Sequence, residues 1–344
     1  DWNLVNPAAR TLYWVNGSGN WNHSGHWSLS SDGASGECPP TPSDDVFFDA
    51  SSGLGAGDKV NLNQNWAFCK KMDWTGASGI LDNGIVPASW ENATQTLQIF
   101  GSLKFTNNMV NDFDGLVMLR AKQAASITSA GNHFKGNLHF WEPAGDWTLN
   151  DDLNVDITIQ HGYGKLHSNN KKLTMRLGWY ATTQDASAEL FLGNSTMTIL
   201  SNHPNVMQGY GYFFYQTSKF HSETSNIVFE NYFFGLLNAY VSPVEFYNVT
   251  FKANSSNLYG GIIKNKLIFE KTGNTLYGGD IYEAEFHDDF TFGDSRPYHK
   301  MKFYPGKRYT FAAGSTQTIV PFNLSLIHIS EPTRLRRISY AVFC

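Results

Sequence analysis

Carboxylates gather between residues 280 and 294, and they are the side chains of this 344-residue chain best suited to chemistry. Glu283 and Glu285 are two residues apart, so they project from the same face of a regular strand. Paired carboxylates about 5–10 Å apart hydrolyse glycosidic bonds, and groups of oxygen ligands bind Ca²⁺. A solvated acidic face fits the same pattern. The candidate catalytic residues are Asp280, Glu283, Glu285, Asp288 and Asp289, with Asp294 beside them.

A second acidic group follows Pro42 and contains Asp44, Asp45 and Asp49. It is a candidate calcium site, and capping of the turn after Pro42 is the alternative. His23 and His26 have the spacing H-x-x-H, which supplies too few ligands for a metal. No H-E-x-x-H, G-x-S-x-G or P-loop pattern occurs. We therefore expect no cofactor apart from a structural calcium ion.

Two dense aromatic runs, at residues 210–215 and 232–234, are candidate binding elements. If they form strands, alternate members face outward. Outward aromatic rows can stack on sugar rings or form a protein interface, whereas neighbouring loops could equally bury them. The candidate binding residues are Tyr210, Tyr212, Phe214 and Tyr232.

The elements that would position these residues repeat along the chain. The sequence Leu258-Tyr259-Gly260-Gly261 recurs as Leu276-Tyr277-Gly278-Gly279. Four phenylalanines, each closing an alternating segment, follow one another at nearly constant spacing: Phe251, Phe269, Phe286 and Phe303. Such spacing is typical of a solenoid, in which each coil stacks one strand about 4.8 Å from the next. A further phenylalanine, Phe229, precedes this series at a slightly longer interval.

Upstream segments alternate apolar and polar residues and are punctuated by Asn and Gly, so they also predict strands. The expected strands are 97–105, 138–140, 147–149, 155–159, 173–177, 189–192 and 197–200. An array of β-sandwiches is the alternative, and it requires hairpins every 8–12 residues. Asn-Gly and Asp-Gly turns occur only in the first third of the chain. The chain is therefore predicted to be all-β: a right-handed parallel β-helix over residues 91–323, preceded by a β-rich cap over residues 1–90.

Composition agrees with an extracellular β-rich protein. Charged residues make up 16% of the chain, aromatic residues 15%, and the net charge is −5. This mild acidity is not the electrostatic pattern of a nucleic-acid-binding protein. No apolar run reaches the roughly 18 residues of a transmembrane helix.

The segment from Tyr13 to Ala50 carries a resemblance to a known group of proteins. It contains Y-W-V-N-G-S-G-N-W, then H-W-S, then P-T-P-S-D-D-V and F-D-A. This succession resembles the opening of large, repeat-rich, adhesin-like surface proteins of Bacteroidetes, many of which are type IX secretion substrates. The resemblance implies a secreted or cell-surface location and a binding function.

Residues 324–344 resemble a translated sequencing adapter, so the natural sequence is expected to end near Asn323, as a metagenomic fragment of a longer gene. The tail contributes three arginines and one glutamate, so without it the net charge changes from −5 to −7. Cys344 belongs to the tail, which leaves Cys38 and Cys69 as an even pair. In an exported protein this pair predicts a disulfide, and two buried thiols are the alternative.

Two functional hypotheses follow. The first is a non-enzymatic, adhesin-like β-helix that presents a long sheet face to a glycan, a surface ligand or another copy of itself. The second is a carbohydrate-active β-helix enzyme, a polysaccharide hydrolase or lyase, that uses the carboxylates of residues 280–294. Convergence of those carboxylates in one groove would favour the enzyme.

Overall fold

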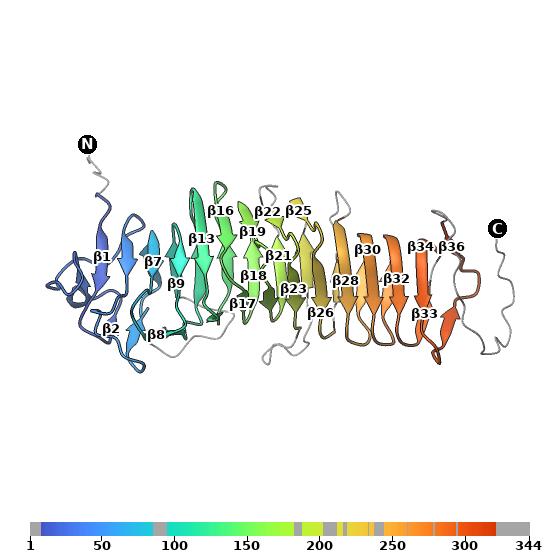
Figure 1. Cartoon of the computed structure of the whole chain (residues 1–344), viewed down its shortest axis with the longest axis horizontal. Coiled ribbons are helices and arrows are strands. Elements are labelled where there is room, and N and C mark those ends of the chain that lie inside the picture. Colours follow the sequence, from blue (N-terminus) through green and yellow to red (C-terminus); the bar gives the residue numbers. More distant parts are fainter. Residues whose placement is uncertain are drawn as a thin grey trace.

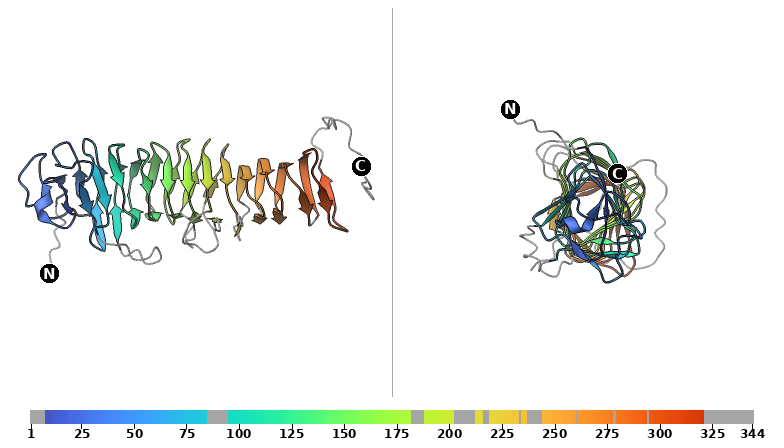
Figure 2. Two further views of the ribbon diagram at one scale, coloured as in Figure 1. Left: turned by 90° about the horizontal axis from the view of Figure 1, so that it is seen from below. Right: turned by 90° about the vertical axis from the view of Figure 1, so that its left-hand side faces the viewer.

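The chain folds into a rod of stacked β-strands. The computed structural model describes residues 8–84, 95–181, 188–201, 212–215, 219–232, 234–236, 244–259, 261–277, 279–293 and 295–320. The strands lie across the rod, and they follow one another along it in sequence order (Figure 1). An end-on view shows the coils superimposed around one core (Figure 2). The one helical element of the described residues is the 3-10 turn η1 (Ser24–His26).

Three faces surround this core in the first two thirds of the rod. Face 1 is a ten-stranded sheet of β1 (Thr11–Trp14), β3 (Trp27–Ser28), β4 (Asp45–Phe47), β7 (Lys71–Asp73), β10 (Leu103–Lys104), β13 (Ala124–Thr128), β16 (Asp146–Leu149), β19 (Lys165–His167), β22 (Glu189–Phe191) and β25 (Lys219–His221). Face 3 is a seven-stranded sheet of β6 (Trp66–Cys69), β9 (Thr96–Ile99), β12 (Leu116–Leu119), β15 (Leu138–Phe140), β18 (Thr158–His161), β21 (Gly178–Ala181) and β24 (Tyr212–Tyr215).

Face 2 consists of two sheets. In both, each strand in the first two thirds of the rod follows a strand of face 1 along the chain. The first contains β2 (Gly19–Asn20), β5 (Lys59–Asn61), β8 (Gly79–Asp82) and β11 (Met109–Asn111). The second contains β14 (His133–Phe134), β17 (Leu153–Val155), β20 (Leu173–Met175), β23 (Thr196–Ile199), β26 (Asn226–Phe229), β28 (Glu245–Phe251), β30 (Ile262–Phe269), β32 (Asp280–Phe286), β34 (Arg296–Phe303) and β36 (Gln317–Ile319).

The described strands of successive coils pair in parallel, so the parallel β-helix predicted from the sequence is confirmed. The parallel coils begin well before the predicted boundary at residue 90, because strand β4 pairs in parallel with both β1 and β7. The Asn-Gly and Asp-Gly pairs do not mark a separate module, because Asn16-Gly17 and Asp114-Gly115 lie at corners between faces, after β1 and after β11. Asp114, for example, donates its backbone N–H to the side chain of Asn83 one coil earlier. Similarly, the single predicted strand 97–105 is two strands, β9 and β10, on different faces.

The coils shorten after residue 230, because two strands replace three. Here face 2 alternates with β27 (Phe234–Leu236), β29 (Asn257–Tyr259) and β31 (Thr275–Tyr277), then with β33 (Phe290–Phe292) and β35 (Tyr309–Phe311). Strands β28, β30, β32 and β34 are seven or eight residues long. The register shifts at a bulge where β28 pairs with β30 and where β30 pairs with β32, in the second case between Ile263 and Lys266. A bulge bends a strand locally. The long bent strand therefore takes the place of two strands and the turn between them.

The phenylalanine column predicted from the sequence is confirmed. Phe229, Phe251, Phe269, Phe286 and Phe303 pair in register on successive parallel strands. Their rings are stacked, with centroids 4.9–5.9 Å apart. The column is buried except at Phe303, which is 43% exposed. Each ring thus covers the ring of the preceding coil, as the near-constant spacing in the sequence requires.

The amino-terminal coil is closed by tryptophans of the segment that carries the resemblance. Trp14, Trp21 and Trp27 are fully buried, and they pack edge to face with ring centroids 4.9–5.1 Å apart. Phe48 continues this cluster into the next coil by stacking on Trp74 at 4.0 Å. The one antiparallel pair among the described strands, β1 with β3, folds the intervening loop back over the core. The predicted cap is therefore limited to this loop, which shields the first coil from water.

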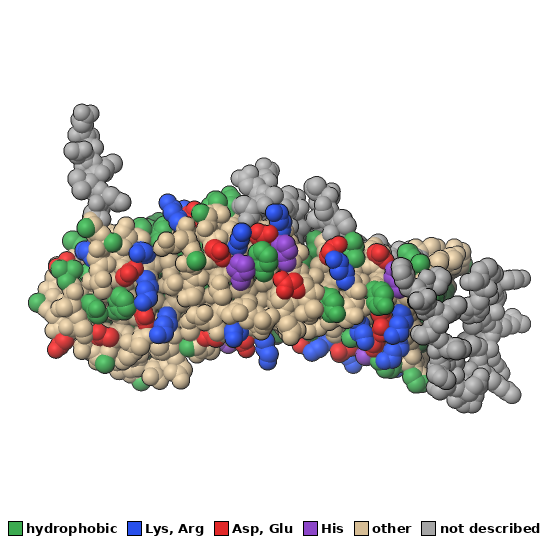
Figure 3. Space-filling view, turned by 45° about the horizontal axis from the view of Figure 1, so that its top comes forward, with side chains coloured by type: hydrophobic (Ala, Val, Ile, Leu, Met, Phe, Trp, Pro, Cys, Tyr) green, Lys and Arg blue, Asp and Glu red, His purple; other side chains and the backbone are tan. Residues whose placement is uncertain are grey.

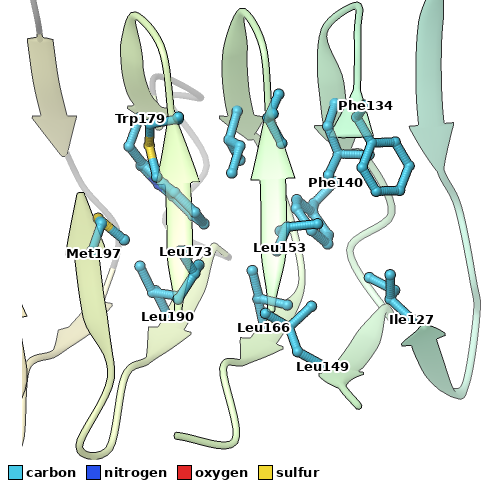
Figure 4. Close-up of a cluster of buried hydrophobic side chains, with 14 of the residues drawn as sticks. Ile127, Phe134, Phe140, Leu149, Leu153, Leu166, Leu173, Trp179, Leu190 and Met197 are labelled. Carbon is cyan, nitrogen blue, oxygen red and sulfur yellow. The ribbon is translucent and has the colours of Figure 1, made fainter. Parts of the chain in front are cut away.

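Buried apolar side chains continue through the middle of the rod as similar columns (Figure 4). Polar side chains stack at one inner corner as well. Ser195 donates its hydroxyl to Ser168 Oγ at 2.7 Å, and the Ser168 hydroxyl donates to the Leu192 carbonyl. The turn beside them contains Asn169 and Asn170 with φ of 53° and 59°. Asn tolerates this left-handed conformation better than most residues, which explains the Asn-rich punctuation of the sequence.

We expect Phe269→Ala to destabilise the protein by roughly 3–5 kcal/mol, because it removes a ring from the middle of the column and leaves a cavity. Chemical denaturation measures the change in the free energy of unfolding. Phe303→Ala is the matched control, since its ring is partly exposed at the end of the same column. Equal losses for the two variants would contradict the column as the source of stability.

Candidate functional site

The two central carboxylates of the predicted catalytic cluster are joined to lysines of neighbouring coils. Glu283 and Glu285 lie on β32, and Lys266 of β30 contacts both, at 3.5 Å and 2.6 Å. On the other side, Lys300 of β34 contacts Glu283 at 2.9 Å. Lys302 approaches Glu285 at 3.5 Å. The side chains of this network are thus cationic on β30, anionic on β32 and cationic on β34, across three successive coils.

Glu285 is the centre of this network and is nearly buried, with 7% of its side chain exposed. Tyr304 donates its hydroxyl to Glu285 Oε2 at 2.8 Å, and His287 Nε2 lies 3.1 Å from the same atom. Burial alone would raise the pKa of Glu285, but hydrogen bonds from Lys266, His287 and Tyr304 outweigh it and hold the pKa at about 2. The hydrogen bond to Glu285 also raises the pKa of Lys266. Both partners therefore stay charged at neutral pH.

The other predicted carboxylates of the described residues also have basic or hydrogen-bonding neighbours. Asp288 accepts from Lys307 at 2.8 Å, and Asp289 accepts from the backbone N–H of Arg308 at 2.8 Å. Asp280 lies 3.8 Å from His299. Asp294 lies outside the described residues. A general acid in a glycosidase needs a raised pKa, whereas that of Glu285 is lowered. The described part of the cluster is thus suited to holding coils together.

The second acidic group caps a turn, which is the predicted alternative to calcium binding. Asp44 is almost fully buried and accepts hydrogen bonds from the backbone N–H and the hydroxyl of Thr41, both at 2.8 Å. Arg10 donates to the same carboxylate at 2.7 Å. Asp45 lies 3.9 Å from Lys70, and Asp49 caps the N–H of Ser51. Among the described residues, no group of three or more His, Cys, Asp or Glu could hold a metal ion.

The predicted Cys38–Cys69 disulfide is wrong, because both cysteines are free thiols. Cys38 is exposed in the loop before β4. Cys69 is fully buried on β6, where it pairs with Ile99 of β9 as part of the core. Its inward position behind the sheet separates it from the outer loop. Cys69 is therefore a small apolar core residue. The predicted alternative of two buried thiols holds for Cys69 but not for Cys38.

The predicted aromatic binding residues are described only in part. Tyr210 lies outside the described residues, and Tyr232 is half-buried. On β24 the register pairs Tyr212 with Gly178, and Phe214 with Tyr180. Tyr180 is 37% exposed. Phe214 of the predicted run thus takes the position of Tyr180, whose ring is exposed, one coil further along the rod.

Face 3 holds further aromatic residues beside this row, which we name the face 3 cluster: His139, Trp141, Tyr163 and Tyr180. Register places His139, Gln160 and Tyr180 in one row across β15, β18 and β21. Trp141 and Tyr163 pack edge to face at 5.2 Å, and His139 lies 5.9 Å from Trp141. A Cβ on Gly162 would come within 2.4 Å of the Trp141 ring, so only glycine permits this packing. Burial lowers the pKa of His139 to about 4, so this ring is neutral at pH 7.

Sequence reasoning missed Trp141 and Tyr163 because it searched for dense aromatic runs. Each follows shortly after a strand of face 3 and belongs to no run of three or more Phe, Tyr or Trp residues. Those two strands, β15 and β18, pair in register on successive coils, with His139 opposite Gln160. A search for aromatic residues that recur once per coil would have found this pair.

The chain matches no protein-family model, and no curated protein or solved structure is significantly similar to it. The described residues include no candidate membrane-spanning helix.

We expect Glu285→Gln to lower the free energy of unfolding by roughly 2–4 kcal/mol at pH 7. Because the folded-state pKa of about 2 lies below the usual 4.5, the stabilisation is complete above pH 4.5 and is lost as the pH falls toward 2. Denaturation of both proteins between pH 7 and 2 measures this convergence. Glu230→Gln, which affects a single half-exposed pair with Lys252, should cost far less. A pH-independent difference would contradict the ionic origin.

We expect iodoacetamide to alkylate Cys38 in the native protein but Cys69 only after denaturation. Burial raises the pKa of the Cys69 thiol well above its usual range and shields it from the reagent. Mass spectrometry of the digest identifies the labelled peptides. A disulfide-linked pair of peptides in a non-reducing digest would restore the original hypothesis.

Proposed function

We propose that this protein is a secreted or cell-surface, adhesin-like β-helix that binds a glycan and performs no catalysis. The observation that supports the proposal is the face 3 cluster. Tyr180 is exposed in the row of His139 and Gln160, and His139 packs against Trp141, which packs against Tyr163. Tyr and Trp combine a flat apolar ring with a polar group, a combination suited to the mixed surface of a sugar. Gln160, between His139 and Tyr180, adds an amide donor and acceptor.

The scaffold favours such binding because it holds these side chains in fixed positions. Strands β15, β18 and β21 pair in parallel over three residues each, and their inner side chains are buried. A ligand would then lose less free energy to ordering of the protein on binding. The rod also presents outward positions at a regular interval of about 4.8 Å from coil to coil, and a polysaccharide likewise has a regular repeat.

The enzymatic alternative has weaker support. It depends on Asp280, Glu283, Glu285, Asp288 and Asp289, all of which lie close to cations or hydrogen-bond donors. An uncommitted carboxyl group with a raised pKa is what glycoside hydrolysis requires. A reducing-sugar assay on soluble polysaccharides tests this point, and sugar release abolished by Glu283→Gln would favour the enzyme.

Screening of the full chain against immobilised polysaccharides, such as cellulose, chitin, xylan and mucin, tests glycan binding. We expect Trp141→Ala and Tyr180→Ala each to weaken binding to the retained polysaccharide about tenfold or more, because central aromatic contacts dominate binding energy. Trp66→Ala is the matched control, since Trp66 is 53% exposed on β6, at the far end of the same face. Retention of no polysaccharide, or an equal loss in the control, would contradict the proposal.

A further inference from the structure

Face 1 carries a row of alternating charges that the proposed glycan site does not use. Asp146, Lys165, Glu189 and Lys219 are register partners on the consecutive strands β16, β19, β22 and β25. In strand order their charges are negative, positive, negative and positive. Asp146 and Lys165 are well exposed, with 45% and 53% of their side chains accessible. The row has no net charge, so it is not suited to a strongly charged partner of one sign.

A second outward row runs beside the first and is aromatic. His167, Phe191 and His221 are register partners on β19, β22 and β25. Their rings are nearly parallel, with centroids 4.5 Å and 4.3 Å apart. His167 Nε2 lies 3.1 Å from Asp146, and His221 Nε2 lies 2.9 Å from Glu189, so the two rows are connected. Figure 3 shows histidine, hydrophobic, acidic and basic side chains gathered on the middle of the visible face.

We propose that this surface, the face 1 ladder of Asp146, Lys165, Glu189 and Lys219 with the aromatic row beside it, binds a second copy of the same chain. The two rods pack face to face and antiparallel, related by a two-fold axis along the strand direction. Reversal of the order of the row brings Asp146 opposite the partner's Lys219, and Lys165 opposite the partner's Glu189. The same surface patch is thus complementary to itself, as a two-fold symmetric interface requires.

The charge order selects this arrangement over a parallel one. If both rods ran in the same direction, each rung would face the identical rung of the partner, and like charges would repel. In the antiparallel arrangement all four rungs face an opposite charge. Phe191 lies next to the centre of the patch, and the stacked imidazoles on either side of it complete an aromatic core for the contact.

The neighbouring strand leaves room for a close approach. On β13 the charged row continues with Ala124, the register partner of Asp146. The second row continues with Ser126, the register partner of Thr148. Both side chains are small, so they do not keep a second rod at a distance.

The interface must be larger than the ladder itself. The four charged residues span only about 15 Å, so the contact must extend over neighbouring strands to reach the roughly 800 Å² per partner of a stable complex. We therefore expect a dimer of micromolar affinity that weakens as salt screens the ladder.

Such a dimer would leave face 3 uncovered on both copies. Two glycan sites on antiparallel rods would then be available to one polymer, which increases its effective affinity. The dimer itself does not depend on the proposed function, because its contact residues lie on a different face.

Sedimentation velocity of the full chain at about 1–100 µM tests the proposal through charge reversal. Lys165→Glu and Glu189→Lys should each be monomeric, because each places like charges opposite one another. An equimolar mixture of the two variants should recover a dimer, since each supplies the charge that the other has lost. Lys104→Glu is the matched control, an exposed lysine of β10 on the same face but outside the ladder, and it should dimerise like the natural chain.

A monomeric natural chain at about 100 µM in low salt would overturn the proposal, as would dimers of the single variants as stable as that of the natural chain. Failure of the mixture to recover a dimer, with melting temperatures of both variants near that of the natural chain, would also overturn it. Recovery in the mixture alone would support the antiparallel arrangement directly, because a structural defect in either variant could not be repaired by the other.

Discussion

In-register parallel pairing between coils is the constraint on which the rest of this structure depends. Each strand forms its backbone hydrogen bonds with the strands one coil before and one coil after it. A side chain is therefore stacked on the residue at the same position of the neighbouring coil, about 4.8 Å away. Inside the rod this produces columns such as Phe251, Phe269 and Phe286, whose rings cover one another. Stability is then shared between neighbouring coils, as expected for a solenoid.

The same constraint determines which polar residues can be buried. A hydroxyl or carboxylate inside a stack has its counterpart one coil away as the nearest partner. Ser195 and Ser168 satisfy each other in this way, and Glu285 is neutralised by Lys266 and Lys302 from the strands on either side. A carboxylate next to another carboxylate in such a row would be strongly destabilised. Alternation of charge along a row is thus a consequence of parallel stacking.

On the outer surface, stacking converts single residues into extended rows. The charges of the face 1 ladder and the aromatic residues of face 3 come from strands that lie a full coil apart in the sequence. No single segment carries either surface. A solenoid can therefore present a binding face without a pocket, and its specificity lies in the order of residue types from one coil to the next. This is the physical basis of both the glycan-binding and the self-association proposals.

The fold class and the main core column could be predicted from the order of residues alone. The alternation of apolar residues and the near-constant spacing of Phe251, Phe269, Phe286 and Phe303 are local properties, and parallel stacking is the arrangement that uses them. The amino-terminal boundary could not be predicted in this way, because a turn dipeptide such as Asp114-Gly115 can form a coil corner as well as a hairpin.

The partners of the polar residues emerged only in the folded rod. Coil lengths vary through the chain, and they decide which polar residues meet. Examples are the Arg10–Asp44 pair, the lysines around Glu285 and the separation of Cys38 from Cys69. Each extra residue in a turn shifts which side chains meet, so contacts between coils follow from the register of the rod and not from spacing in the sequence.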